Sequence, residues 1–88
     1  MKLRRHDDWL AAKVGDELVM MSATTGRYLG LNDVGARVWD LLETPCDVDA
    51  LCARLEQEYE VAPEVCRAEI DAFVTELIAH GAASFDQR

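Results

Sequence analysis

Residues 27–42, Arg-Tyr-Leu-Gly-Leu-Asn-Asp-Val-Gly-Ala-Arg-Val-Trp-Asp-Leu-Leu, contain the point at which the pattern of the chain changes from strand to helix. Residues 27–31 are predicted to form a short strand, because two leucines recur there with a period of two. From Asn32 onward the apolar residues recur with a helical period, and Asn is a favoured N-cap residue. We therefore expect a helix over about 33–43, directly after the strand.

Upstream of this stretch lie two more apolar runs, residues 9–14 and 17–22, each of which is predicted to be a strand. Gly15-Asp16 ends the first run, and residues 23–26, which close with a glycine, end the second; both are turn signals. Two tight turns that join three strands indicate an antiparallel meander in which the strands follow the order of the chain.

Downstream, the helical period continues. Asp47 is positioned to cap a helix over about 48–59, and Pro63 suits the first turn of a third helix over about 63–80. The first few residues and the last four carry no regular pattern, and we expect them to be loose. A small sheet is marginal by itself, so the helices are expected to cover its apolar face. The prediction is a winged-helix-like α+β fold, a three-stranded antiparallel sheet followed by three helices, in a single domain of residues 1–88.

The chain is acidic. Its 88 residues carry 17 acidic and 9 basic side chains, for a formal net charge of −8. The excess is confined to residues 33–88, where thirteen acids stand against four bases, whereas residues 1–32 have a small positive excess. Proteins that bind nucleic acids cluster Lys and Arg against phosphates. The helical part of this chain is therefore expected to repel DNA and RNA.

The sequence also restricts the compartment. No apolar run reaches the roughly 18–20 residues of a membrane helix, and the basic start of the chain lacks the apolar stretch of a signal peptide. We therefore expect a cytoplasmic protein with no membrane partner. The three cysteines, Cys46, Cys52 and Cys66, form no Cys-x-x-Cys pair and are expected to be free thiols.

Motifs for catalysis, cofactor binding or metal binding are absent from the sequence. It contains no phosphate-binding or dinucleotide-binding glycine motif and no nucleophile elbow. His6 and His80 have no Cys or His at metal-ligand spacing. Glu56, Glu58 and Glu60 have the pattern of a solvated acidic face. We therefore predict a binding domain without enzymatic activity, cofactor or metal.

The third predicted strand is a candidate binding edge. An edge strand exposes unpaired N–H and C=O groups to which another strand can add, and residues 28–31 carry none of the charges or prolines that usually block an edge. Leu29 and Leu31 are expected to face the core. Tyr28 and Gly30 lie on the other face, where Gly30 permits the close approach of another backbone. A packed aromatic and a strand irregularity would explain these two residues equally well.

The third predicted helix has a wide apolar set for a small domain. One ridge of this set can pack against the sheet and the first helix, while the other borders a groove next to the third strand. The simpler interpretation is that the whole set belongs to the core. Its members are Cys66, Ile70, Phe73, Val74, Leu77 and Ile78.

In their order along the chain, these segments resemble the PqqD-like family. Residues 26–42 are similar to that family's signature Tyr-x-x-Leu-Asn-x-x-Gly-x-x-(Ile/Val)-Trp-x-Leu-Leu. The similarity covers about residues 14–83. It continues, after the signature, through residues 48–51, 58–61, 63–66 and 70–77 and ends at Gly81.

The resemblance implies a RiPP recognition element, a domain that binds the leader segment of a ribosomally made and post-translationally modified peptide. Such a domain has the winged-helix-like fold, no catalytic activity and no cofactor. Its partners are the precursor peptide and a modifying enzyme, leader protease or cyclase. A free-standing domain of this size fits a lasso-peptide pathway or a radical-SAM partner, and we favour the lasso pathway.

In the family, the leader adds as a strand to the third strand, in the groove between that strand and the third helix. Carried over by position, the resemblance implies a peptide-binding site. Its residues would be Arg27, Tyr28, Leu29, Gly30, Leu31, Cys66, Arg67, Ile70, Asp71, Val74 and Leu77.

Two other functions remain open at this stage. Exposed edge strands also pair protomers, which allows a small regulatory or dimerisation subunit. A winged-helix DNA-binding regulator would share the fold, so the fold alone does not distinguish it from a peptide-binding domain. In the third helix, however, Arg67 is the one basic residue, against Glu64, Glu69, Asp71 and Glu76. This charge disfavours contact with DNA.

Overall fold

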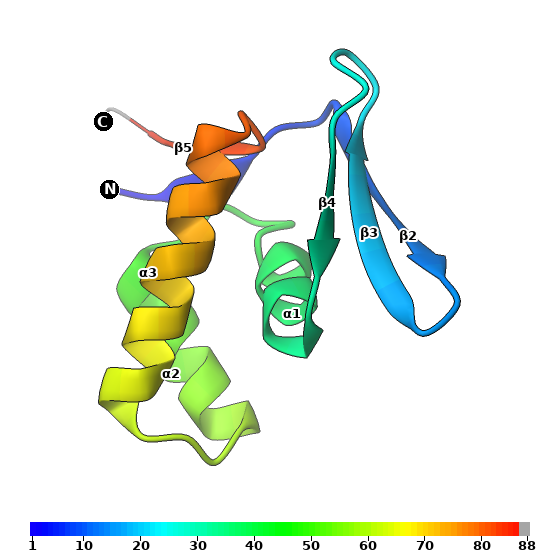
Figure 1. The fold of residues 1–88 in the computed structure, drawn as a ribbon. Coiled ribbons are helices and arrows are strands. Elements are labelled where there is room, and N and C mark those ends of the chain that lie inside the picture. The colour runs from blue at the N-terminus through cyan, green and yellow to red at the C-terminus, as the bar shows by residue number, and fades with distance from the viewer. Residues whose placement is uncertain (87–88) are drawn as a thin grey trace.

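The computed structural model describes residues 1–86. It contains three helices, a three-stranded sheet and a two-stranded sheet (Figure 1). Along the chain the elements are β1 (Leu3–Arg5), β2 (Trp9–Val14), β3 (Glu17–Ser22), β4 (Tyr28–Leu31), α1 (Asp33–Leu41), α2 (Val48–Glu58), α3 (Pro63–Ala79) and β5 (Ala83–Phe85).

Strands β2, β3 and β4 form the antiparallel meander that the turn signals predict, in the order β2-β3-β4. Gly15 and Gly26 lie in the two turns with φ of 66° and 73°, a backbone region that side chains with a Cβ rarely occupy. The second turn is closed by the Gly26 amide, which donates to the Ser22 carbonyl over 3.0 Å. The predicted sheet topology is therefore confirmed.

The three helices lie within one or two residues of their predicted bounds. Asn32 caps α1 as predicted, because its Oδ1 accepts a 2.7 Å hydrogen bond from the Gly35 amide. Pro63 opens α3. Asp47 stands at the N-cap position of α2, but its side chain forms no capping hydrogen bond. Its carboxylate lies 3.7 Å from the amino group of Met1 instead.

The expectation of loose chain ends is wrong for most of the residues concerned. β1 pairs with β5 in antiparallel register, and the Asp86 amide donates to the Lys2 carbonyl over 2.8 Å. Leu3 is completely buried. His6 binds the Gly81 carbonyl and the Ser84 hydroxyl through its two ring nitrogens, over 2.8 and 2.9 Å. The ends of the domain are thus joined into a second sheet; residues 87 and 88 lie outside the described residues.

The core lies between the helices and the inner face of the meander. Met20 and Leu31 contribute from the sheet, Val38 from α1, and Ile70 and Leu77 from α3, and all five are at least nine-tenths buried. Leu29, on the same sheet face as Leu31, is half-buried against this cluster. The prediction that the leucine face of the third strand points inward is therefore confirmed.

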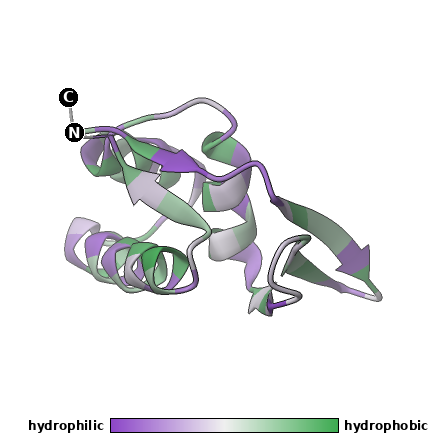
Figure 2. Cartoon of the chain, turned by 90° about the horizontal axis from the view of Figure 1, so that it is seen from above, coloured by the Kyte–Doolittle hydropathy of each residue, from purple (hydrophilic) through white to green (hydrophobic). Residues whose placement is uncertain are grey.

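The outer face of the meander is apolar but uncovered. Leu10, Val14, Met21 and Tyr28 are each more than half exposed. Figure 2 shows the β2–β3 hairpin projecting away from the helices, with hydrophobic residues along both strands. Within the described part of the chain, no helix combines the length and the apolarity needed to cross a membrane.

The buried first strand makes a stability prediction. We expect Leu3→Ala to lower the free energy of unfolding by about 2–5 kcal/mol, as other buried Leu→Ala changes do. Met1→Ala is the control, because Met1 is 74% exposed, and should change it by no more than about 0.5 kcal/mol. Urea denaturation followed by circular dichroism measures both. Equal stability of the two variants would mean that β1 does not contribute to the folded domain.

Candidate functional site

The free edge of β4 is the first component of the site. Within the described residues β4 pairs with β3 alone. The Ser22 amide donates to the Arg27 carbonyl over 2.8 Å, and residues of an antiparallel ladder alternate between bonded and non-bonded pairs. The Leu29 amide therefore points toward β3. The amides and carbonyls of Tyr28 and Gly30 point toward the free edge, where an added strand can bind them.

A pocket of about 240 Å³ opens where β4 ends, between the first turn of α1 and the middle of α3. Figure 1 shows α1 between β4 and α3, and α1 contacts both. The pocket has an apolar floor with polar groups at its rim. Its lining consists of Asn32, Val34, Gly35, Glu69, Ala72, Phe73 and Glu76.

Gly35 lets Phe73 form the floor of this pocket. A Cβ on Gly35 would lie 3.2 Å from Phe73 Cε1 and 3.2 Å from Asn32 Oδ1, closer than ordinary van der Waals contact. The glycine thus brings the α3 aromatic ring directly against the capped first turn of α1. Phe73 is half-buried, so part of its ring remains available to a ligand.

The predicted strand residues lie along the free edge as expected. Arg27, Tyr28 and Gly30 are exposed, and Tyr28 is 72% exposed. Tyr28 is therefore not a packed core aromatic, and nothing lies within 4 Å of a Cβ built on Gly30. Leu29 is half-buried and Leu31 is buried, so these two support the strand from the core side.

The apolar helix residues predicted for the site lie in the core. Cys66, Ile70, Val74 and Leu77 are between 0% and 6% exposed, and none of them lines the pocket beside β4. Of the wide apolar set on α3, only Phe73 lines this pocket, and Ile78 is 41% exposed. Most of the set therefore belongs to the core, and a groove bordered by one of its ridges stays a prediction.

Arg67 and Asp71 lie on a different side of α3. Arg67 Nη1 donates to Asp49 at the start of α2 over 2.6 Å, and Arg67 Nε donates to Asp71 over 3.1 Å. Arg67 therefore links α3 to α2, Asp71 pairs with Arg67 along α3, and neither lines the pocket beside β4. The hydrogen bonds to these carboxylates raise the pKa of the Arg67 guanidinium, which stays charged.

The sequence prediction missed the face of α3 that does line the pocket. Glu69, Ala72, Phe73 and Glu76 recur at helical spacings of three and four residues, so they form one stripe. The available signal was Phe73 at the margin of the apolar stripe, with Glu69 one turn before it and Glu76 one turn after it along the helix. Gly35, in the first turn of a helix, was the second signal of a close approach.

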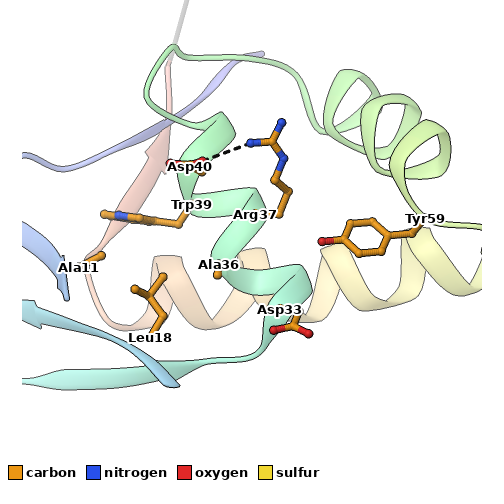
Figure 3. A pocket seen from close by; sticks show the side chains of 8 residues that line it. All are labelled: Ala11, Leu18, Asp33, Ala36, Arg37, Trp39, Asp40 and Tyr59. Atoms are coloured by element: carbon orange, nitrogen blue, oxygen red, sulfur yellow. Dashed lines mark hydrogen bonds and ion pairs between the residues drawn. The ribbon is translucent and has the colours of Figure 1, made fainter. Parts of the chain in front are cut away.

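A larger and more open pocket lies on the other side of α1, near Tyr59 (Figure 3). Its most prominent polar group is Arg37, whose Nε donates to Glu58 over 2.7 Å and whose Nη1 donates to Asp40 over 3.2 Å. The Arg37 hydrogen bond lowers the pKa of the Glu58 carboxyl. Because these groups neutralise one another and tie α1 to α2, we assign them a structural role.

No group of three or more His, Cys, Asp or Glu side chains is placed to hold a metal ion in residues 1–86. His80 packs edge-on against Trp9, with 6.5 Å between the ring centroids. His6 has a different contact, a hydrogen bond to the Gly81 carbonyl that joins the two ends of the domain. The cysteines are free, as predicted, and burial raises the pKa of the Cys52 and Cys66 thiols.

An unpaired edge strand close to a small pocket of mixed polarity, in a winged-helix-like domain, is typical of small peptide-binding modules. The family model for coenzyme PQQ synthesis protein D (PqqD) matches residues 17–82 of the chain. Because that match covers most of the sequence, the chain belongs to the PqqD family. The family prediction is therefore confirmed, and the α+β fold class agrees with it.

Two solved structures are similar to the whole domain. One is TbiB1 in complex with the TbiA(beta) leader peptide, with a TM-score of 0.81, 26% identity, and coverage of 97% of this chain and 99% of that chain. The other is lasso peptide synthetase B1 complexed with the leader peptide, with a TM-score of 0.80, 26% identity, and coverage of 97% and 100%. No curated protein sequence matches the chain significantly.

The buried cysteines make a reactivity prediction. We expect iodoacetamide at pH 8 to alkylate Cys46, which is half-buried, before Cys52 and Cys66, because burial excludes the reagent from the two inner thiols. Mass spectrometry of tryptic peptides measures the order. In guanidinium chloride all three should react at similar rates. Early labelling of Cys66 in the native protein would contradict its place in the core.

Proposed function

We propose that this domain binds the leader segment of a ribosomally made precursor peptide and delivers the peptide to a modifying enzyme, without catalysing a reaction itself. The observation that carries the proposal is the free β4 edge next to the pocket between α1 and α3. Support comes from the match, over 97% of this chain, to two domains that are each in complex with a leader peptide.

The leader adds as a fourth strand on residues 27–31. The outward amides and carbonyls of Tyr28 and Gly30 pair with its backbone, which supplies register and much of the affinity. Side chains of the leader that point toward the helices reach the pocket, where Phe73 offers an apolar contact. One or two such anchors supply most of the selectivity, as at other small interfaces.

The helix residues implied by the family resemblance take an indirect part in this proposal. Cys66, Ile70, Val74 and Leu77 hold α3 in place from the core, so that the neighbouring stripe faces the leader. Direct peptide contact by Arg67 and Asp71 stays a prediction. The ion pairs of Arg67 with Asp49 of α2 and with Asp71 of α3 would have to break first.

The pathway we propose is lasso-peptide biosynthesis in the cytoplasm, with a leader protease and a macrocyclase as the enzymes that receive the bound peptide. One of the two similar structures is a lasso peptide synthetase B1. A non-catalytic role also agrees with the exposed edge and open pocket, which offer main-chain pairing and an apolar contact rather than an enclosed reaction chamber.

A second candidate function is pairing of protomers, favoured by the exposed outer face of the meander, where Leu10, Val14 and Met21 are more than half exposed. Uncovered apolar faces commonly mark protein interfaces. Light scattering after size-exclusion chromatography tests this function: a concentration-dependent dimer that Met21→Lys dissociates supports pairing.

DNA binding fits poorly, because the one basic residue of α3, Arg67, is already bound by Asp49 and Asp71.

The outward amide of residue 30 gives a direct test. We expect Gly30→Pro to weaken binding of a leader peptide that the wild-type domain binds, about tenfold or more, because a carbonyl of the leader loses its donor. Stability should change little, since proline is tolerated where an edge-strand amide faces solvent. Gly30→Ala keeps the amide and has open space for its Cβ, so it should bind nearly as the wild type does. Calorimetry and circular dichroism measure binding and folding.

The position of the bound leader is tested by amide chemical shifts during a titration. Shifts should cluster on residues 27–35 and on the α3 stripe from Glu69 to Glu76. A cluster on β2 or α2 would show that the peptide binds elsewhere, even though the family membership stands.

The pocket can be tested without disturbing the core. Ala72 lines it and Ala68, one turn earlier on α3, does not, although both are exposed. We expect Ala72→Trp to fill the pocket and weaken leader binding about tenfold or more, with Ala68→Trp unchanged; stability should differ by no more than about 0.5 kcal/mol, as at other surface sites. Equal binding by the two variants would remove the pocket from the site.

A further inference from the structure

The outer face of the meander, on the side of the sheet away from the helices, holds an apolar groove of about 300 Å³. Ala12 and Val19 are a cross-strand pair of small side chains, and the next pair on this face, Leu10 and Met21, has larger ones. The groove therefore crosses the strands over Ala12 and Val19. Its lining, which contains no charged residue, consists of Leu10, Ala12, Val14, Val19, Met21 and Ala23.

The groove leads toward the free edge of β4. Met21 pairs with Tyr28, which is 72% exposed, and Val19 pairs with Gly30, which has no side chain. A Cβ built on Gly30 would meet no atom within 4 Å. No side chain of β4 therefore stands between Val19 and the edge, and Tyr28 lies beside this opening.

A strand that adds to β4 places alternate side chains on this outer face. The direction of the added strand does not matter, because residues opposite one another on neighbouring strands share a face. The side chain opposite Gly30 therefore lies at the opening of the groove. To contact Val19 it has to cross β4, a distance of about one strand spacing, ~4.8 Å. The ring of Phe, Tyr or Trp has that length, whereas the side chains of Ala and Val do not.

We propose that the leader residue opposite Gly30 is aromatic, and that its ring lies across Gly30 in the groove, against Val19 and beside Tyr28. This inference rests on the proposed function and adds to it a second subsite, on the face of the sheet away from the pocket that Phe73 lines. An aromatic side chain that covers a glycine of the neighbouring strand stabilises β-sheets. The ring of Tyr28 offers a further aromatic contact.

The size of the outer face favours a single side chain over a second copy of the domain. The three strands contain six, six and four residues, and alternate ones face outward, so the face has only about eight residues. A stable protein interface needs roughly 20–30 residues from each partner. One aromatic ring, in contrast, fits a groove of about 300 Å³.

Peptide selection followed by NMR locates the ring. Short random peptides are selected on the immobilised wild-type domain, and those that Gly30→Pro no longer binds are kept as edge binders. We expect one aligned position to be aromatic in these peptides, and its replacement by Ala to weaken binding about tenfold. Nuclear Overhauser effects should connect the ring to the Val19 methyl groups rather than to Phe73.

Gly30→Leu closes the opening of the groove while it keeps the backbone amide. Peptides selected on the wild type should bind this variant about tenfold more weakly, and selection on it should replace the aromatic residue by a small one. Ala68→Leu adds a leucine to the exposed face of α3, outside both the groove and the pocket beside β4, and should keep the wild-type preference.

Val19 and Val14 allow the same substitution at two places in the groove. Both residues line it, but only Val19 pairs with Gly30. Val19→Thr exchanges a methyl group for a hydroxyl where the ring lies, so it should weaken binding about threefold. Val14→Thr, on the far strand, should leave binding unchanged.

The outcomes distinguish this inference from the proposed function. Edge binders without an aromatic position, ring contacts with Phe73 in place of Val19, or equal effects of the two Val→Thr changes would overturn the inference and leave leader binding intact. So would a dimer that persists at saturating peptide, because a second copy would then cover the groove. An absence of any binder sensitive to Gly30→Pro would overturn both. Circular dichroism verifies folding, and Val19→Thr decides the matter if Gly30→Leu unfolds.

Discussion

The 2.7 Å hydrogen bond from the Gly35 amide to Asn32 Oδ1 determines where β4 ends and α1 begins. Asn32 keeps an extended backbone, with φ of −82° and ψ of −179°, while the next residue is helical. The chain therefore turns directly from the edge strand into the helix that contacts both β4 and α3. Because Gly35 has no side chain, Phe73 can lie against that same turn. The end of β4, the start of α1 and the Phe73 ring on α3 thus meet near the N-cap residue Asn32.

Local periodicity explains which parts of the fold were predictable. The meander and the three helices each repeat an apolar pattern within a few residues, so their existence and order follow from the sequence. β1 and β5 contain three residues each and pair across about eighty residues of chain. A three-residue strand has no measurable period. The burial of Leu3 is therefore a consequence of tertiary pairing, which no local pattern reports.

Of the candidate site, the β4 edge was predictable from the sequence and the α3 side was not. Once the strand order is known, the free edge of β4 follows, and so does the outward direction of Gly30. The α3 side of the pocket was not predictable in this way. The apolar stripe through Cys66 and Ile70 marks the part of α3 that the core covers, whereas the pocket is lined by the stripe next to it. Successive residues of a helix are about 100° apart. Neighbouring positions of a helix therefore face different surroundings: Arg67 contacts Asp49 of α2, whereas Cys66 lies in the core.

Helix α3 thus presents two adjacent stripes with different demands. The core stripe is apolar and densely packed, so substitutions in it change stability. The pocket stripe is mixed and half open, so its residues can vary between members of a family without unfolding the domain. β4 has only four residues, which limits the number of main-chain groups that its exposed edge offers to other copies of the chain.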